Sequence, residues 1–204
     1  IRVSLVGSEM CIRDRAPDVY QGSPTGYVGY MATVAKVSSF IVLARLVAVS
    51  LTFIIDQFDL FFGAVVILSV LAGALFAANQ SDLKRLIAYS GVIQSGFILS
   101  GISSGVYGIS ASTFYLITYI IQLIGIFTVF SIISGQLSSD FQISNISGLF
   151  KENKFITITF SIFMLGLAGL PLTSGFVSKF ILITNLWSYA VSYTHLTLPT
   201  KPFV

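Results

Sequence analysis

The sequence predicts an all-α polytopic membrane protein, a bundle of about five transmembrane helices whose last helix is broken at mid-membrane. Of its 204 residues, 55% are hydrophobic and only 9% are charged, and the mean hydropathy is +0.91. These values lie outside the range of ordinary soluble proteins. Several apolar runs of about 20 residues can each cross about 30 Å of hydrocarbon as a helix. A buried soluble core fits this composition less well.

The two ends of the chain differ from its middle. Residues 1–15 carry five charged side chains, and residues 191–204 form a polar tail that contains proline. Both segments resemble translated adapter sequence, so we expect two non-native ends around a membrane domain at 16–190. The only cysteine, Cys11, and the only histidine, His195, fall in these ends. The sequence therefore gives no support for a disulfide, a soft-metal site or imidazole chemistry in the membrane domain.

Four helices are predicted before the break. The first, at 27–54, follows the turn-rich segment APDVYQGSPTG, whose prolines and glycines prevent a continuous helix. The second is expected at 60–79. Ser81 and Asp82 can cap the third, at 83–103, which ends in the glycine- and serine-rich segment GISSGVYG. The fourth is expected at 109–134.

A fifth membrane segment, at 154–187, is too long for one straight span and is interrupted at LAGLPLTSGF. Pro171 cannot donate to the helical ladder, and Thr173, Ser174 and Gly175 loosen the backbone that follows it. We therefore predict a helix that breaks at mid-membrane. Irregular backbone at that depth is typical of helices that line a buried or water-filled cavity.

Charge placement predicts the orientation of the helices. Lys84 and Arg85 lie at the start of the third helix, and Lys151 and Lys154 lie at the approach to the fifth segment and at its first residue. Because short cytoplasmic loops are rich in lysine and arginine, we expect the first, third and fifth helices to start in the cytoplasm. Lys84 and Arg85 are then interpreted as interfacial topology signals. The net charge is only +3, and no basic patch interleaved with aromatic residues suggests nucleic-acid binding.

Two lysines lie deep inside apolar helices. Lys36 is roughly 13 Å from the start of its helix, where insertion costs about 2.5 to 3.5 kcal/mol. Lys179 follows the predicted break, where the positive end of the restarted helix disfavours another positive charge. Both are candidate proton-relay residues. The alternatives are a structural ion pair for Lys36 and an incidental lysine beside a packing kink for Lys179. Arg45, near the far interface, is interpreted as structural.

Other polar side chains inside the predicted helices could complete a water-filled path between the lysines, although serines and tyrosines also pack membrane helices without transport. These candidates are Ser38, Ser39, Tyr89, Ser90, Gln94, Tyr115, Thr118, Tyr119 and Gln122.

Six segments of the chain together resemble one family. APDVYQGSPT, MATVAKVSSF, SDLKRLIAYSGVIQSGF, FYLITY, ISGLF and LAGLPLTSGFVSKF occur in the order and approximate spacing of the antiporter-like membrane subunits of respiratory complex I. The likeness is closest to the subunit N family of NADH:quinone oxidoreductase and covers about 16–187. The chain departs from it at Gln122-Leu123, where many subunit N sequences carry Met-Asn.

The resemblance implies a subunit of about fourteen helices with two inverted repeats, of which this chain resembles the eighth to the twelfth. Lys36 matches the central lysine of the eighth helix, and Lys179 matches the lysine of the broken twelfth helix. Both are then proton-relay residues of a translocase subunit. A glutamate of the fifth helix and a lysine of the seventh would lie outside this chain.

The same resemblance implies the cofactors, partners and location. NADH, flavin, iron-sulfur clusters and quinone are expected on other subunits, with no redox site in this chain. The expected partners are other membrane-arm subunits, lipid, protons and water. The bacterial inner membrane is the favoured location, with an organellar inner or thylakoid membrane as the alternative. Two further functions stay open: a sodium/proton antiporter of the same fold, and a structural membrane segment without transport.

Overall fold

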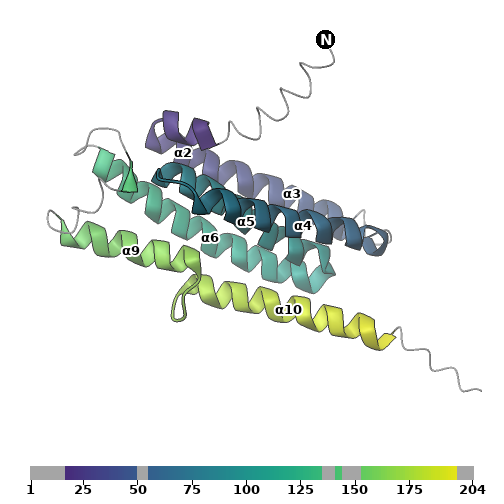
Figure 1. The fold of residues 1–204 in the computed structure, drawn as a ribbon. Helices are drawn as coiled ribbons and strands as arrows, with labels where there is room; N and C mark the ends of the chain where they lie inside the picture. The colour runs from purple at the N-terminus through teal and green to yellow at the C-terminus, as the bar shows by residue number, and fades with distance from the viewer. Residues whose placement is uncertain (1–16, 50–54, 135–140, 144–152, 197–204) are drawn as a thin grey trace, which may run out of the picture.

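The computed structural model describes residues 17–49, 55–134, 141–143 and 153–196, and this part of the chain is almost entirely helical (Figure 1). An isolated antiparallel bridge between Asp82 and Gln142 is its one extended pairing. The predicted all-α fold is therefore confirmed. The elements are α2 (Thr25–Tyr30), η1 (Met31–Ala35), α3 (Lys36–Val49), α4 (Ile55–Ala78), α5 (Leu83–Ser103), α6 (Gly105–Ser134), α9 (Lys154–Ala168) and α10 (Ser174–Leu196).

The first predicted helix is one continuous rod that contains a π-helical turn. It begins two residues earlier than predicted, directly after Pro24, and is described as far as Val49. The π turn η1 ends immediately before Lys36, so the extra residue that such a turn accommodates sets the direction in which this lysine leaves the helix. Residues 50–54 of the prediction lie outside the described part of the chain.

The next three helices match the prediction closely at α5 and extend it at α4 and α6. The Asp82 carboxylate caps α5 by accepting from the backbone N–H groups of Lys84 and Arg85, as the sequence indicated. Gly105, with φ of +80°, turns the chain from α5 directly into α6. The predicted GISSGVYG segment therefore ends one helix and starts the next with Ser104 as the only intervening residue.

The predicted break lies between α9 and α10. Gly169 closes α9 in the left-handed conformation, with φ of +84°, and its N–H donates to the carbonyls of Leu165 and Gly166. The Thr173 hydroxyl accepts from the N–H of Phe176 at 3.4 Å at the start of α10. Figure 1 shows α9 and α10 lying end to end, with the connecting loop projecting away from their common axis.

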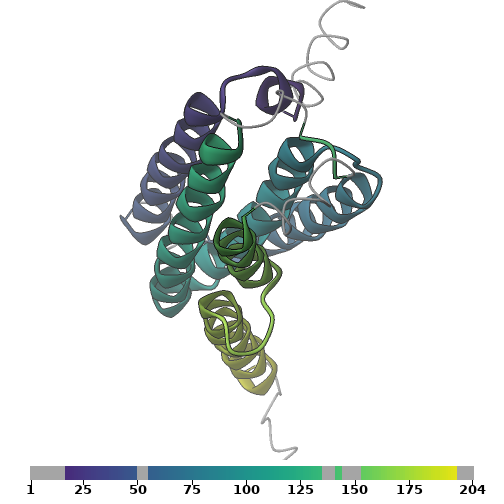
Figure 2. The same cartoon turned by 90° about the vertical axis from the view of Figure 1, so that its left-hand side faces the viewer.

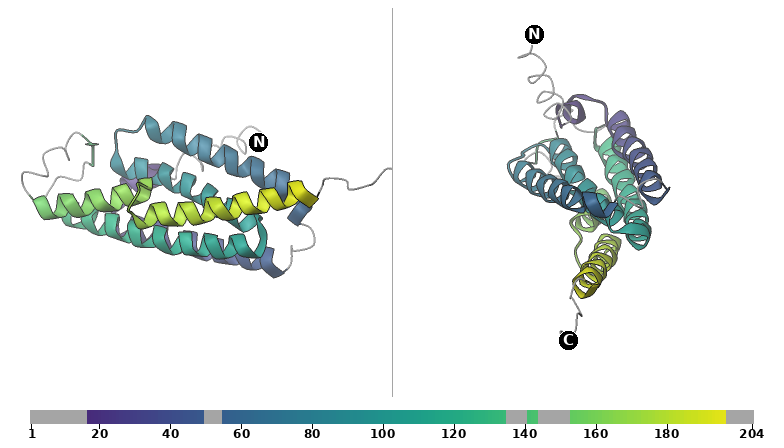
Figure 3. Two further views of the ribbon diagram at one scale, coloured as in Figure 1. Left: turned by 90° about the horizontal axis from the view of Figure 1, so that it is seen from below. Right: turned by 90° about the vertical axis from the view of Figure 1, so that its right-hand side faces the viewer.

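The helices form an elongated bundle with α5 and α6 at its centre. End-on views show α3 beside α6, α4 beside α5, and the α9–α10 pair on a third side (Figures 2 and 3). Gly73 of α4 and Gly96 of α5 let these two helices approach closely, since a Cβ at Gly73 would lie 2.7 Å from the side chain of Ile93. Two clusters of buried apolar side chains fill the bundle, one around Phe130 and one around Leu182.

Four described helical stretches are long and apolar enough to cross a membrane: Thr25–Val49, Leu60–Ala78, Leu83–Ser103 and Gly108–Ser134. Their outward surfaces are rich in large apolar side chains, and α4 is exposed over most of its length. This pattern fits a bundle whose surroundings are apolar, because lipid-facing residues need no burial inside the protein. The chain is an integral membrane protein.

Candidate functional site

Lys36 reaches from α3 to the centre of the bundle. Its amine donates a 3.3 Å hydrogen bond to the hydroxyl of Tyr119 on α6 and lies 5.7 Å from the centre of that ring. Gly91 of α5 makes room for the amine, since a Cβ at this position would lie 2.2 Å from Nζ. Residues of three helices, α3, α5 and α6, thus surround this amine.

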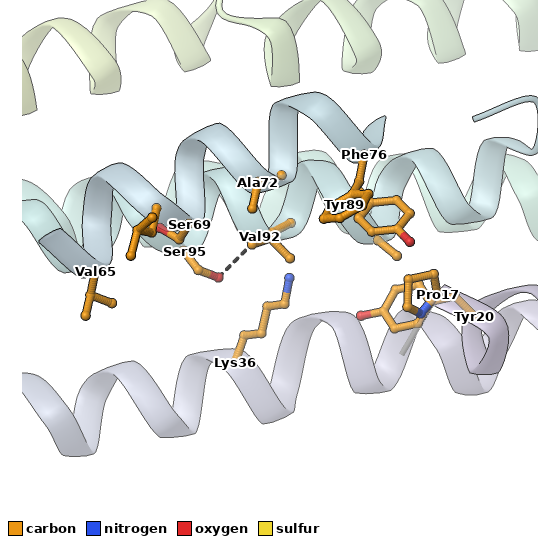
Figure 4. Close-up of a pocket in the computed structure, with 14 residues that line it drawn as sticks. Pro17, Tyr20, Lys36, Val65, Ser69, Ala72, Phe76, Tyr89, Val92 and Ser95 are labelled. Carbon is orange, nitrogen blue, oxygen red and sulfur yellow. Dashed lines mark hydrogen bonds between the residues drawn. The ribbon is translucent and has the colours of Figure 1, made fainter. Parts of the chain in front are cut away.

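A cavity of about 550 Å³ opens beside Lys36 between α3, α4 and α5 (Figure 4). The lysine amine points into it, and the hydroxyl groups of Tyr20, Ser69 and Ser95 belong to residues of its otherwise largely apolar wall. Tyr89 also lines the cavity and stacks on Phe76 of α4, with ring centres 5.6 Å apart. The cavity is large enough to hold several water molecules next to the amine.

Tyr115 and Gln94 form a buried pair further along the bundle. The Tyr115 hydroxyl donates to Oε1 of Gln94, and Nε2 of Gln94 donates to the backbone carbonyl of Leu167 at 3.1 Å. Tyr115 is one helical turn from Tyr119 on the same face of α6, and both are almost fully buried. These contacts link the neighbourhood of Lys36 to the end of α9.

Lys179 meets the same end of α9. Its amine donates to the carbonyls of Leu167 and Ala168, at 3.1 Å each, and lies 5.6 Å from the centre of the Phe97 ring. The Leu167 and Ala168 carbonyls lie in the last turn of α9, where carbonyls have no partner within the helix, and Pro171 has no N–H that could pair with them. The break therefore supplies Lys179 with two acceptors.

The carbonyl end of α9 also acts on the charge of Lys179, which the sequence did not predict. The sequence predicted that the positive end of α10 repels the ammonium, but the side chain extends back to the carbonyl end of α9, which attracts a cation. Gly169 is needed for this approach, since a Cβ there would lie 3.0 Å from Cδ of Lys179. Lys179 thus lies between two half-helix ends of opposite polarity.

The remaining residues predicted at the break also lie together. Gly175 packs directly on the carbonyl of Gly166, where a Cβ would lie 1.8 Å from the oxygen. Gln122 of α6 fills the adjoining space and its amide donates to the Ser174 hydroxyl at 3.5 Å. Gln122, at the point where the chain departs from the subunit N pattern, therefore contacts the break.

Three of the predicted water-path residues bond within their own helices and do not join the contacts described above. The hydroxyls of Ser38 and Ser39 both donate to the carbonyl of Ala35 in their own helix, and both residues are exposed. Ser90 likewise donates to Ile87 within α5. Such bonds satisfy a hydroxyl locally and leave it no special relation to Lys36. Thr118 is buried and donates to Tyr115 in its own helix, and Arg45 is exposed on α3.

Lys84 is buried against neighbouring segments at one end of the bundle, and its interpretation as an interfacial topology signal stays a prediction. Its amine donates to the carbonyl of Ser23 at 3.2 Å and lies 4.6 Å from the centre of the Phe141 ring. Arg85 instead forms a more exposed ion pair with Asp18. The segment before α2 and the start of α5, predicted to share one face of the membrane, are in contact at one end of the bundle. Which face is cytoplasmic stays a prediction.

Two sets of polar contacts surround the two lysine amines. Lys36 bonds to Tyr119, Tyr115 lies one turn earlier on the same helix, and Gln94 and Lys179 share the Leu167 carbonyl. Hydroxyls, amides and amines can pass or hold protons when water completes the chain. Gly91, Gly169 and Phe97 were not predicted from the sequence, although glycines near the candidate residues are a signal of close backbone approach.

Comparisons with known proteins agree with this architecture. The family model described as NADH:quinone oxidoreductase/Mrp antiporter, TM, matches residues 14–200. NADH-quinone oxidoreductase subunit N of Mycobacterium tuberculosis H37Rv is 41% identical over 169 residues, which is 80% of this chain and 32% of that protein. NAD(P)H-quinone oxidoreductase subunit 2 of Crocosphaera subtropica is 35% identical over 84% of this chain and 33% of its own length.

A solved structure shares the fold as well. A chain of respiratory complex I from Thermus thermophilus with bound aureothin superposes with a TM-score of 0.66 and 31% identity, over 93% of this chain and 45% of that one. The chain spans about a third of the length of the curated relatives it matches. Because the family model covers nearly the whole sequence, the chain belongs to the NADH:quinone oxidoreductase/Mrp antiporter transmembrane family.

Proposed function

We propose that this chain is part of a membrane-arm subunit of NADH:quinone oxidoreductase that moves protons through Lys36 and Lys179, driven by redox chemistry in other subunits. The observation that carries the proposal is the position of both amines among polar groups of the bundle: Lys36 bonds to the buried Tyr119 hydroxyl, and Lys179 shares the Leu167 carbonyl with the buried Gln94. The relatives are named as subunits of NADH-quinone oxidoreductase and the Thermus structure as respiratory complex I, which supports the assignment of this chain to such a complex.

Electrostatic repulsion between two protonated amines is of a useful size if they come within about 10 Å of each other. At that separation, in a medium of effective dielectric near 20, the repulsion is about 1.7 kcal/mol. Protonation of one amine would then favour release of the proton from the other by slightly more than one pKa unit, which is a factor of roughly 18. Movement of one proton against 100 mV requires about 2.3 kcal/mol, so a few such couplings in series are of the right order.

The redox cofactors belong to other subunits in this proposal. NADH, flavin, iron-sulfur clusters and quinone would be bound elsewhere in the complex, and this chain would contribute helices, buried lysines and a path for water. Its partners would be neighbouring membrane-arm subunits and lipid. The bacterial inner membrane is the proposed location, which the mycobacterial relatives support.

A second candidate is a sodium/proton antiporter, because the description of the matching family names Mrp antiporters beside the oxidoreductase. The two functions are distinguished by expressing the full-length subunit together with the proteins encoded beside its gene. NADH-driven acidification of membrane vesicles is then measured. The proposal predicts acidification that requires NADH and quinone and persists without sodium. Sodium-driven proton exchange that needs neither NADH nor quinone would favour the antiporter, and neither activity would favour a structural segment.

A further inference from the structure

The structure assigns to Gln94 the role of a positioning residue: its amide holds the Leu167 carbonyl in the place where that oxygen receives the amine of Lys179, and connects it to Tyr115. This inference rests on the proposed relay function of Lys179. It adds a residue on α5 that controls Lys179 without carrying a proton as an acid or base itself.

The Leu167 carbonyl is the point that the two side chains share. This carbonyl lies in the last turn of α9 and has no donor within the helix, because the helix ends at the left-handed Gly169. Nε2 of Gln94 and Nζ of Lys179 each donate to this oxygen at 3.1 Å. The two nitrogens are therefore separated by no more than twice that distance, and either donor can keep the oxygen paired when the other leaves.

The other end of the amide fixes its orientation. Oε1 of Gln94 accepts the hydroxyl proton of Tyr115, so only Nε2 is available to the carbonyl. Gln94 is 4% exposed, and Tyr115 is 3% exposed. In such a buried place an unpaired amide or carbonyl is costly, so a neutral side chain with one acceptor and one donor is strongly favoured.

A change at Gln94 should therefore alter the position of the Lys179 amine or its hold on the proton. If the amide is lost, the Leu167 carbonyl has only the lysine as a side-chain donor among the described contacts, and both the oxygen and the amine lose their fixed position. If the amide becomes a carboxylate, a negative charge lies within a few ångströms of the ammonium and holds its proton. The first change displaces the amine, and the second also retains its proton through charge.

The helices packed against α10 carry no acidic side chain that could mask the effect of a glutamate at position 94. On α5, α6 and α9 the titratable side chains are Lys84, Arg85, Tyr89, Tyr107, Tyr115, Tyr119 and Lys154, and α10 itself carries no acidic residue. Tyr115 is the one that bonds directly to Gln94. A glutamate at position 94 would therefore be the only acidic side chain on these four helices.

The experiment compares Gln94→Glu with Gln94→Met in the full-length subunit within the assembled complex. Protons moved per NADH oxidised are measured in vesicles across a range of external pH. Both variants should lower this ratio at neutral pH, on the order of tenfold, as expected for displacement of a reacting group. With Gln94→Glu the ratio should recover when the pH is raised by about 1 to 3 units, because the carboxylate holds the lysine proton more tightly.

Gln94→Met should show no alkaline recovery, since it adds no charge. Gln94→Asn, whose amide is one methylene too short to reach both partners, should behave like Gln94→Met and serves if the glutamate variant does not assemble. Ser100→Ala on the same helix, which removes only a local bond to Phe97, should pump normally. Equal loss in the Glu and Met variants at every pH would indicate a purely structural role and overturn the inference.

The relay itself is checked in parallel with Lys179→Ala. Loss of pumping in Lys179→Ala together with normal pumping and an unchanged pH profile in all Gln94 variants would overturn the role of Gln94 and leave the relay standing. Normal pumping in Lys179→Ala would overturn both.

Discussion

Lys36 and Tyr119 are 83 positions apart in the sequence, yet the lysine amine donates a 3.3 Å hydrogen bond to the tyrosine hydroxyl. The bond ties α3 to α6 inside the bundle. It also places a hydroxyl between the amine and Tyr115, one turn away.

Tyr119→Phe should lower proton pumping severalfold with little loss of assembled complex, because the ring that packs in the core is kept and only the hydroxyl is removed. The measurement is NADH-driven acidification of vesicles, normalised to NADH oxidation. Tyr30→Phe is the control, since Tyr30 is 64% exposed on α2 and should be neutral. Equal effects of the two changes would show that the Tyr119 hydroxyl plays no part.

Gly91→Ala should displace the Lys36 amine while the backbone stays in place. The added Cβ would lie 2.2 Å from Nζ, and the atom that must move is the flexible end of a side chain. Pumping should therefore fall much more than assembly. Gly63→Ala on α4 is the control, because no neighbouring atom lies within 4 Å, and replacement of a helical glycine there should stabilise by about 0.5 to 1 kcal/mol.

Gly169→Ala should affect both stability and pumping. Its φ of +84° makes a side chain costly by about 1 to 2 kcal/mol, and the new Cβ would lie 3.0 Å from Cδ of Lys179. Gly105→Ala has the same backbone penalty, with φ of +80°, but no atom within 4 Å. Both variants should lose thermal stability, and only Gly169→Ala should also lose pumping per NADH. A pumping defect of equal size in Gly105→Ala would contradict this contact with Lys179.

Lys84→Met should destabilise one end of the bundle more than Arg85→Met. The Lys84 amine pairs the Ser23 carbonyl and lies over Phe141, and loss of these contacts should cost about 1 to 3 kcal/mol. Arg85 and Asp18 form a partly exposed pair, with side-chain exposures of 33% and 57%, for which about 0 to 1 kcal/mol is expected. Retention of the subunit in the complex on heating measures the difference, and the opposite order would refute it.

The helical fold could be predicted from the sequence because a chain that crosses a membrane needs apolar helices of a fixed minimum length. Apolar runs of spanning length gave the helices, and Asp82 was identifiable as the cap of α5 since its position precedes an apolar run. The break was predictable from Pro171 and its neighbours. Its geometry was not, because the left-handed Gly169 that ends α9 precedes the proline and gives no charge or hydropathy signal.

The partners of the candidate residues could be predicted only in part. Lys36 and Lys179 were evident as charges in apolar helices, but the hydroxyl of Tyr119 and the carbonyl of Leu167 depend on how helices pack, which periodicity does not encode. The place of Lys84 at a helix start predicts an interfacial position. Its contacts with the Ser23 carbonyl and the Phe141 ring come from segments distant in the sequence, which no local pattern reveals.

The most direct test of the central proposal is the number of protons moved per NADH oxidised when Lys179→Ala is introduced into the full-length subunit of the assembled complex. We predict that the complex assembles, that quinone reduction by NADH remains measurable, and that proton pumping is abolished or strongly lowered. A normal ratio of protons to NADH in this variant would contradict the relay.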